Sequence, residues 1–164
     1  MRLALLLIPS VLVLLVAATA RAQAPGVFQQ RCAVCHQPTG VGIPGVYPPI
    51  AGTIGGYVWL PQGRAFLVHL LLHGMDGAIT SQGTTYEGLM PPAADFNDED
   101  LADVINYVLQ NLNARQLPSD FKPINAQEFK AARADNLTPT DVLHEREKLL
   151  AALGKSSRAD IGGR

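Results

Sequence analysis

The feature that most constrains this sequence is a group of two cysteines and a histidine, Cys32-Ala33-Val34-Cys35-His36, which contains both cysteines of the chain. The spacing Cys-x-x-Cys-His is typical of covalent haem c attachment. Two thiols three positions apart can add to the two vinyl groups on one porphyrin edge, and the histidine that follows then lies under the iron. The motif therefore predicts a chain that folds around a large, flat, apolar group.

Other uses of a Cys-x-x-Cys pair fit this sequence less well. A zinc site would need further ligands, but there is no other cysteine, and His69, His73 and His144 lie in helical patterns. A thioredoxin-like redox pair follows a β-strand in a βαβ unit, and no such strand precedes Cys32. A disulfide between near neighbours would constrain little of the chain. His69 and His73 have the spacing of a helical metal pair, but no acidic third ligand stands nearby in the sequence.

The first 22 residues have the pattern of a signal peptide. Met1-Arg2 gives a positive start, residues 3–18 are almost wholly apolar, and Ala20-Arg21-Ala22 matches an A-x-A cleavage site. We expect export and a mature chain that begins near Gln23. The alternative is an uncleaved membrane anchor, for which the apolar run is barely long enough.

Composition and charge limit the remaining possibilities. The chain has 15 glycines and 12 prolines but only 6% aromatic residues, which predicts a loop-rich body whose apolar core is completed by the bound group. Residues 23–112 contain two basic and seven acidic side chains, whereas residues 113–164 contain nine basic and seven acidic ones. An acidic body with a mildly basic tail argues against nucleic acid as a partner and leaves protein docking open.

A haem held in this way needs a second axial ligand, and methionine is a common one. Beyond Met1 the methionines are Met75 and Met90, and Met90 stands in Gly88-Leu89-Met90-Pro91-Pro92. A strong amphipathic helix follows, with Asn97 as its N-cap and acidic residues in its first turn. Its apolar face is formed by Leu101, Val104, Ile105, Val108 and Leu112.

In this order of features the chain resembles the monohaem class I c-type cytochromes over residues 28–112. The attachment motif, a proline-bearing loop, the sequence Gly-x-x-Tyr-x-Gly-x-Met-Pro at residues 83–91 and a closing helix all occur in the family's order. The resemblance implies an all-α class I cytochrome c fold, in which short helices surround one covalent haem c. Together with the leader pattern, it divides the chain into a signal peptide at residues 1–22, a cytochrome domain at 23–112, and a linker with a helical extension at 113–164.

The resemblance also implies a set of site residues. Cys32 and Cys35 would hold the haem, while His36 and Met90 would bind the iron from opposite sides, with Met75 as the rival to Met90. The family orients its histidine with a proline carbonyl about a dozen residues later; Pro48 lies there, and Pro49 is the alternative in register. Three further residues would direct polar groups at the haem propionates, namely Tyr47, Trp59 and Arg64.

The last fifty residues lie beyond the family pattern and contain a small internal repeat. Residues 124–129 with Arg133 match residues 137–142 with Arg146 at an offset of 13, and each unit has an N-cap residue and an acid three positions later. The repeat predicts two capped helices, at about residues 126–134 and 139–153, as a two-helix C-terminal extension. Their apolar faces either pack on the cytochrome body or dock on a partner.

Together these features favour an electron carrier rather than an enzyme. With both axial positions filled by His36 and Met90, the iron changes oxidation state without binding a substrate. The resemblance implies a periplasmic location and redox protein partners, either a dehydrogenase or a terminal oxidase, with membrane attachment only if the leader is uncleaved. The alternatives are a haem-based peroxidase or gas sensor with a labile distal methionine, and an assembly or docking subunit of a dehydrogenase or oxidase complex.

Overall fold

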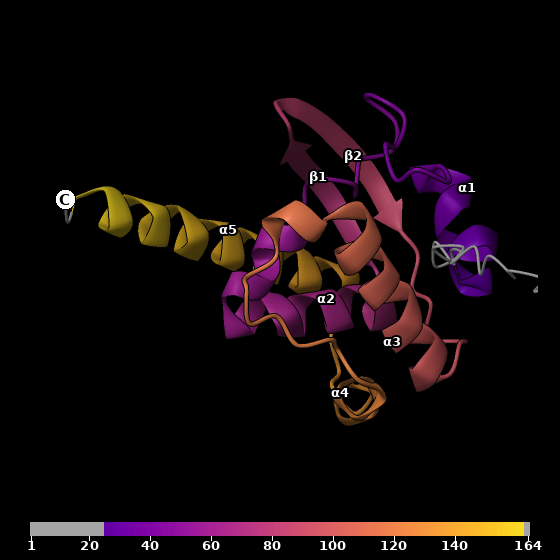
Figure 1. Ribbon diagram of the computed structural model, residues 1–164. Helices are drawn as coiled ribbons and strands as arrows, with labels where there is room; N and C mark the ends of the chain where they lie inside the picture. The colour runs from indigo at the N-terminus through magenta and orange to yellow at the C-terminus, as the bar shows by residue number, and fades with distance from the viewer. Residues whose placement is uncertain (1–24, 163–164) are drawn as a thin grey trace, which may run out of the picture.

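The computed structural model describes residues 25–162, with side chains up to residue 155, so the predicted signal peptide lies outside the described residues. Short helices and one β-hairpin surround a cavity, and a long C-terminal helix extends beyond the rest of the structure (Figure 1). Among the described residues, none of the helices has the length and apolar character needed to span a membrane.

The first and last helices of the cytochrome region pack on each other. The chain enters through η1 (Phe28–Cys32) and α1 (Ala33–His36), so the cysteine motif itself is helical. The closing helix is α3 (Asp98–Tyr107), continued by η3 (Val108–Leu112). The rings of Phe28 and Tyr107 meet with centroids 4.9 Å apart. As predicted, α3 begins at the N-cap Asn97, whose side chain accepts a hydrogen bond from the Asp100 amide at 2.8 Å.

Between these helices lie η2 (Gly55–Trp59), α2 (Pro61–His73) and a β-hairpin. The hairpin pairs β1 (Met75–Ser81) with β2 (Thr84–Met90) in an antiparallel register that places Met75 opposite Met90. The helical fold class is confirmed, with the addition of a hairpin that the sequence did not predict. Gly77 and Gly88 made the strands hard to recognise in the sequence, because glycine is uncommon in strands. The two glycines pair with each other across β1 and β2, with φ angles of 124° and 145° that few other residues tolerate.

The C-terminal extension packs back on the body, which answers the question that the sequence left open. After η4 (Ala114–Gln116), α4 (Ala126–Ala132) lies against α2 and α3, while α5 (Pro139–Gly162) lies against α2 and β1 (Figure 1). The repeat positions Phe129 and Val142 are fully buried in the common core, together with Leu149. Both predicted helices are confirmed, although α5 continues past residue 153 to Gly162.

Candidate haem-binding site

A cavity of about 370 Å³ opens beside the cysteine motif. Its wall is formed by α1, the loop at residues 46–48, the end of α2 and the inner side of the hairpin. The predicted residues Cys32, Cys35, His36, Tyr47, Pro48 and Met90 all line it. Apolar side chains complete the lining, among them Leu71, Ile79, Leu89 and Ala93.

His36 is held with one ring nitrogen fixed. Its Nδ1 lies 2.8 Å from the Pro48 carbonyl oxygen, so Nδ1–H donates to that oxygen and Nε2 is the nitrogen left for a metal. Only 8% of the residue's surface is exposed. Burial lowers the pKa of His36, and the hydrogen bond to Pro48 only partly opposes this, so the imidazole is neutral at physiological pH and ready to act as a ligand. Of the two prolines considered, the structure selects Pro48.

The loop that carries Pro48 depends on a glycine. Gly42 has a φ angle of 67°, and its amide donates to the His36 carbonyl at 2.9 Å. A Cβ at this position would collide with the carbonyl oxygens of Tyr47 and Pro48, so only glycine lets the two parts of the loop approach. Gly42 thus joins the end of α1, through the His36 carbonyl, to the turn at residues 47–48 that orients the histidine ring.

Two methionine side chains face the cavity from the hairpin. Met75 and Met90 are direct partners across β1 and β2, so their side chains stand on the same face, and both line the cavity. Met75 is 9% exposed, and Met90 is half-buried. Gly74 packs against the backbone of Met90. Its φ angle is 73°, and it lies so close to the Met90 carbonyl that a Cβ would collide with the carbonyl oxygen.

The two cysteines are free and half-buried. Burial raises the pKa of the Cys32 thiol to about 11, while the charge of Arg31 lowers it and Cys35 raises it further. In this folded conformation a free Cys32 thiol is therefore protonated at neutral pH and a poor nucleophile for disulfide exchange.

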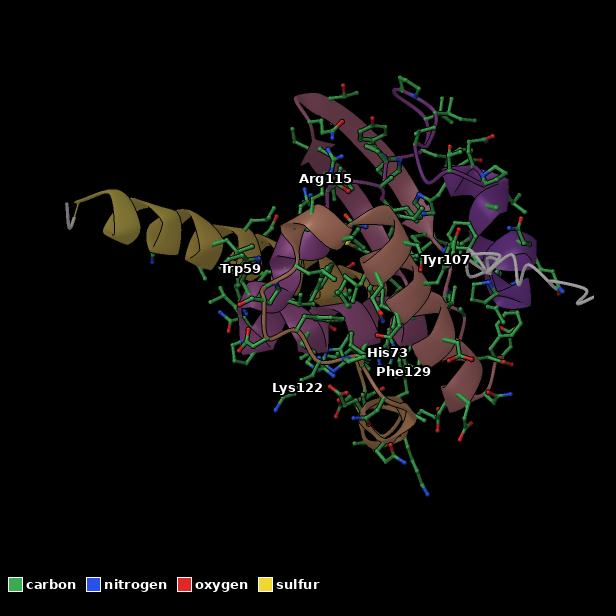
Figure 2. All side chains as sticks on the ribbon, viewed as in Figure 1. Trp59, His73, Tyr107, Arg115, Lys122 and Phe129 are labelled. Atoms are coloured by element: carbon green, nitrogen blue, oxygen red, sulfur yellow. The ribbon has the colours of Figure 1, made fainter. Side chains whose placement is uncertain are left out.

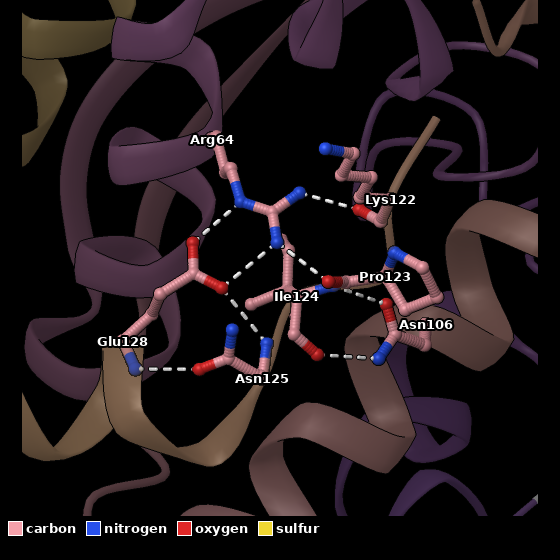
Figure 3. A network of polar contacts seen from close by, with 7 residues as sticks. All are labelled: Arg64, Asn106, Lys122, Pro123, Ile124, Asn125 and Glu128. Atoms are coloured by element: carbon pink, nitrogen blue, oxygen red, sulfur yellow. Dashed lines mark hydrogen bonds and ion pairs between the residues drawn. The ribbon is translucent and has the colours of Figure 1, made fainter. Parts of the chain in front are cut away.

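Trp59 and Arg64 are not brought to the cavity, contrary to the expectation from the sequence. In Figure 2 Trp59 lies on the opposite side of the molecule from α1, and its indole Nε1 donates to the Gln116 carbonyl at 2.6 Å. Arg64 faces the C-terminal extension, where its guanidinium binds the Glu128 carboxylate and the Lys122 and Pro123 carbonyls (Figure 3). Both side chains are used to attach the linker and extension, which the family pattern does not contain.

The remaining histidines, His69, His73 and His144, do not line the cavity. His69 bridges two carboxylates, with Nδ1 2.9 Å from Glu145 and Nε2 3.1 Å from Asp135. The ring of His73 lies 6.0 Å from that of His69, and His144 is exposed on α5. Within residues 25–162, no group of three or more candidate side chains is arranged to hold a metal ion. The acidic partners of His69 come from far along the chain and were invisible in the local sequence.

Asn113 is a structural residue of the site that sequence reasoning missed. It is 2% exposed and connects the end of η3 to the loop after Pro48. Its Oδ1 accepts from the amides of residues 53, 54 and 55 at 3.0, 3.1 and 3.2 Å. Its Nδ2 donates to the Ile50 and Val108 carbonyls, both at 2.9 Å. The only sequence signal was an asparagine at the end of the closing helix.

These residues fit a covalently bound haem. Two thiols one turn apart stand at the edge of a largely apolar cavity, and a neutral histidine with its Nδ1 fixed is next to them. Methionine side chains line the hairpin wall of the same cavity. Together the fold and this donor set define a haem-binding protein of the c type.

Comparison with known proteins agrees with this class. The family described as Cytochrome c matches residues 22–112. A cytochrome c-552 of Thermus thermophilus is 41% identical over 137 residues, which cover 83% of this chain and 93% of that protein. A second cytochrome c-552 of the same species is 41% identical over 119 residues, 73% of this chain and 91% of its own length. The chain belongs to the cytochrome c family: it is an electron carrier, not an enzyme, with covalent haem c attached through its Cys-x-x-Cys motif.

The match to the first relative also reaches the extension. An alignment over 83% of the chain needs more residues than the first 112 can supply, so it continues beyond the part that the family matches. At least part of the extension is thus aligned with this relative.

Proposed function

We propose that this protein is a periplasmic single-electron carrier in which His36 and Met90 are the axial ligands of one haem c held by Cys32 and Cys35. The observation that carries the proposal is that one cavity is lined both by His36, fixed by the Pro48 carbonyl, and by the hairpin methionines. Bound haem c supplies a one-electron iron couple, and ligation by histidine and methionine raises its reduction potential.

The protein's own residues would keep electron transfer at the iron fast by holding both ligands in place. His36 cannot rotate, because its Nδ1 is bonded to a loop that Gly42 and Asn113 fix in turn. Met90 is preferred to Met75 because it stands at the end of β2, directly before two prolines that limit its backbone. Met75 is the more buried of the two and belongs to the core beneath the hairpin. Two fixed ligands leave little to rearrange when the iron is oxidised or reduced.

The partners that we propose are redox proteins, a dehydrogenase as donor or a terminal oxidase as acceptor. Apolar side chains are exposed around the cavity: Val46 and Leu89 line it and Val34 lies within the motif itself. An apolar surface beside the redox centre favours short-lived docking by a protein partner. The proposed periplasmic location rests on the leader at residues 1–22, and a mature N-terminus at Gln23 would support it.

Ligand competition in the haem-loaded protein tests this function. The reduced wild type and Met75→Ala are expected to stay low-spin and to refuse carbon monoxide at neutral pH. Met90→Ala should become high-spin and bind carbon monoxide, because it alone opens the iron. Opening of the site by Met75→Ala instead would show that the ligand was wrongly assigned. Carbon monoxide binding by the wild type would favour a peroxidase or gas sensor.

A further inference from the structure

The 13-residue repeat of the extension is repeated in structure as well as in sequence. In the first unit Asn125 and Glu128 form a reciprocal capping box, with bonds of 3.2 and 2.8 Å. In the second, Thr138 and Asp141 make the same pair of contacts, at 3.2 and 2.8 Å. The next residue of each unit is fully buried, Phe129 in one and Val142 in the other. Each unit is thus the first turn of a helix, with a capped N-terminus, a buried apolar side chain, and an arginine four residues after that side chain.

The arginine of the second unit reaches the hairpin. Arg146 Nη2 donates to the Thr80 carbonyl of β1 at 3.0 Å, and the residue is only 8% exposed. On the same helix, Leu143 packs on Gly77 of β1 so closely that a Cβ at Gly77 would collide with it. Gly77 also lines the cavity. Helix α5 therefore packs against a strand that itself forms part of the wall of the haem site.

The arginine of the first unit reaches the chain just beyond Met90. Arg133 Nη1 donates to the Ala94 carbonyl at 2.9 Å, and Nη2 donates to the Phe96 carbonyl at 2.6 Å. Its Nε also binds the Asp98 carboxylate at 2.6 Å. These acceptors lie between Met90 and the first turn of α3.

The two repeat units thus hold one segment, residues 75–98, at two points; we call it the distal segment. The first point is Thr80, close to the hairpin turn, and the second is the stretch at residues 94–98. Arg146 holds it on β1, and the β1–β2 pairing carries that restraint to Met90, the partner of Met75. Arg133 holds it after Met90. Bonds from a charged guanidinium to a carbonyl are among the stronger hydrogen bonds in proteins, so the restraint at each point is appreciable.

We propose that the repeat is a two-point clamp, in which Arg133 and Arg146 are positioning residues that keep the distal methionine in the cavity. The ligand part of this inference rests on the proposed function, because it takes Met90 as the ligand. The extension then has a role in the redox site itself: it limits how readily the methionine leaves the iron and admits an external ligand.

Imidazole binding to the ferric, haem-loaded full chain tests the clamp. Arg146→Met and Arg133→Met keep most of the side-chain volume and remove the hydrogen bonds. Arg146→Met should raise the affinity for imidazole about tenfold, the effect of losing one such bond. Arg133→Met should raise it at least as much, because it removes three contacts. The matched control is Arg64→Met, because Arg64 also fastens the extension to the body but makes no bond to the distal segment. It should leave the affinity unchanged. Arg146→Lys, which keeps the charge, should recover part of the wild-type value.

A second measurement separates the clamp from the ligand assignment. Amide hydrogen exchange of residues 75–90 should accelerate in Arg146→Met and stay at the wild-type rate in Arg64→Met, whichever methionine binds iron. Equal changes in all three arginine variants, or none in Arg133→Met and Arg146→Met, would overturn the clamp. If Met90→Ala leaves imidazole affinity unchanged, the proposed function fails on its ligand while the exchange data still decide the clamp.

Discussion

Replacing Asn113 with alanine should destabilise the protein more than any other single loss of a polar side chain discussed above. The asparagine makes five hydrogen bonds to backbone groups, three as acceptor and two as donor, and it is 2% exposed. Alanine would leave all five backbone groups without this partner. It would also weaken the attachment of the loop at residues 50–55 to the end of η3, leaving the bond from the Gly52 amide to the Leu112 carbonyl. This loop is close in sequence to the Pro48 carbonyl that orients His36.

The expected magnitude follows from counting these bonds. Each hydrogen bond contributes about 1 kcal/mol net, and water can replace some of those at the part-buried amides of Thr53 and Ile54, so we expect a loss of about 3–5 kcal/mol. The matched control is Asn106→Ala. Asn106 makes two bonds, to the amide and carbonyl of Ile124 at 2.9 and 2.7 Å, and its loss should cost about 1–2 kcal/mol.

Guanidinium denaturation of both haem-loaded variants, followed by far-ultraviolet circular dichroism, measures these costs. Amide exchange at residues 53–55 should accelerate in Asn113→Ala and remain unchanged in Asn106→Ala. Equal costs for the two variants would refute the reasoning, because they would show that Asn113 is no more than an ordinary polar contact.

Three further predictions concern other parts of the structure. Phe129→Ala should cost about 3–5 kcal/mol in thermal or chemical unfolding, since the ring is fully buried between the extension and the body. Gly74→Ala should displace Met90 and raise the high-spin fraction in the ferric visible spectrum, because its Cβ would collide with the Met90 carbonyl. The hydrogen bond from Arg64 lowers the pKa of Glu128 in the folded protein below its ordinary value of 4.5. The ionised carboxylate therefore stabilises the fold fully at pH values above 4.5. Glu128→Gln should therefore be less stable than wild type at pH 7, and the difference should vanish as the pH falls through the lowered pKa of the folded state; a difference that persists in stronger acid would contradict this.

The parts of the site that could be predicted from the sequence are those whose chemistry is local. The cysteine motif and the histidine after it are consecutive, so their spacing was enough to place them. The family resemblance narrowed the proline that orients His36 to Pro48 or Pro49, and the structure has the hydrogen bond to Pro48. The closing helix was equally clear, because Asn97 and the acids after it form an ordinary N-terminal cap. The capped repeat likewise predicted both helices of the extension.

The parts that could not be predicted depend on contacts between distant residues. Arg64 was assigned to the haem because the family resemblance implied that role, but its partners, the Lys122 carbonyl and the Glu128 carboxylate, lie about sixty residues later in the chain. The hairpin was missed because its paired glycines resemble loop positions until the register aligns them. Asn113 makes five contacts that no local pattern reports.

The central claim is that one methionine of the hairpin, Met90, binds the iron opposite His36. Nuclear magnetic resonance of the reduced protein with labelled methionine methyl groups tests it most directly, because a methyl held over the porphyrin ring is shifted far upfield. We predict one such signal, retained in Met75→Leu and lost in Met90→Leu. A shifted signal that belongs to Met75, or no shifted methionine signal at all, would contradict the account.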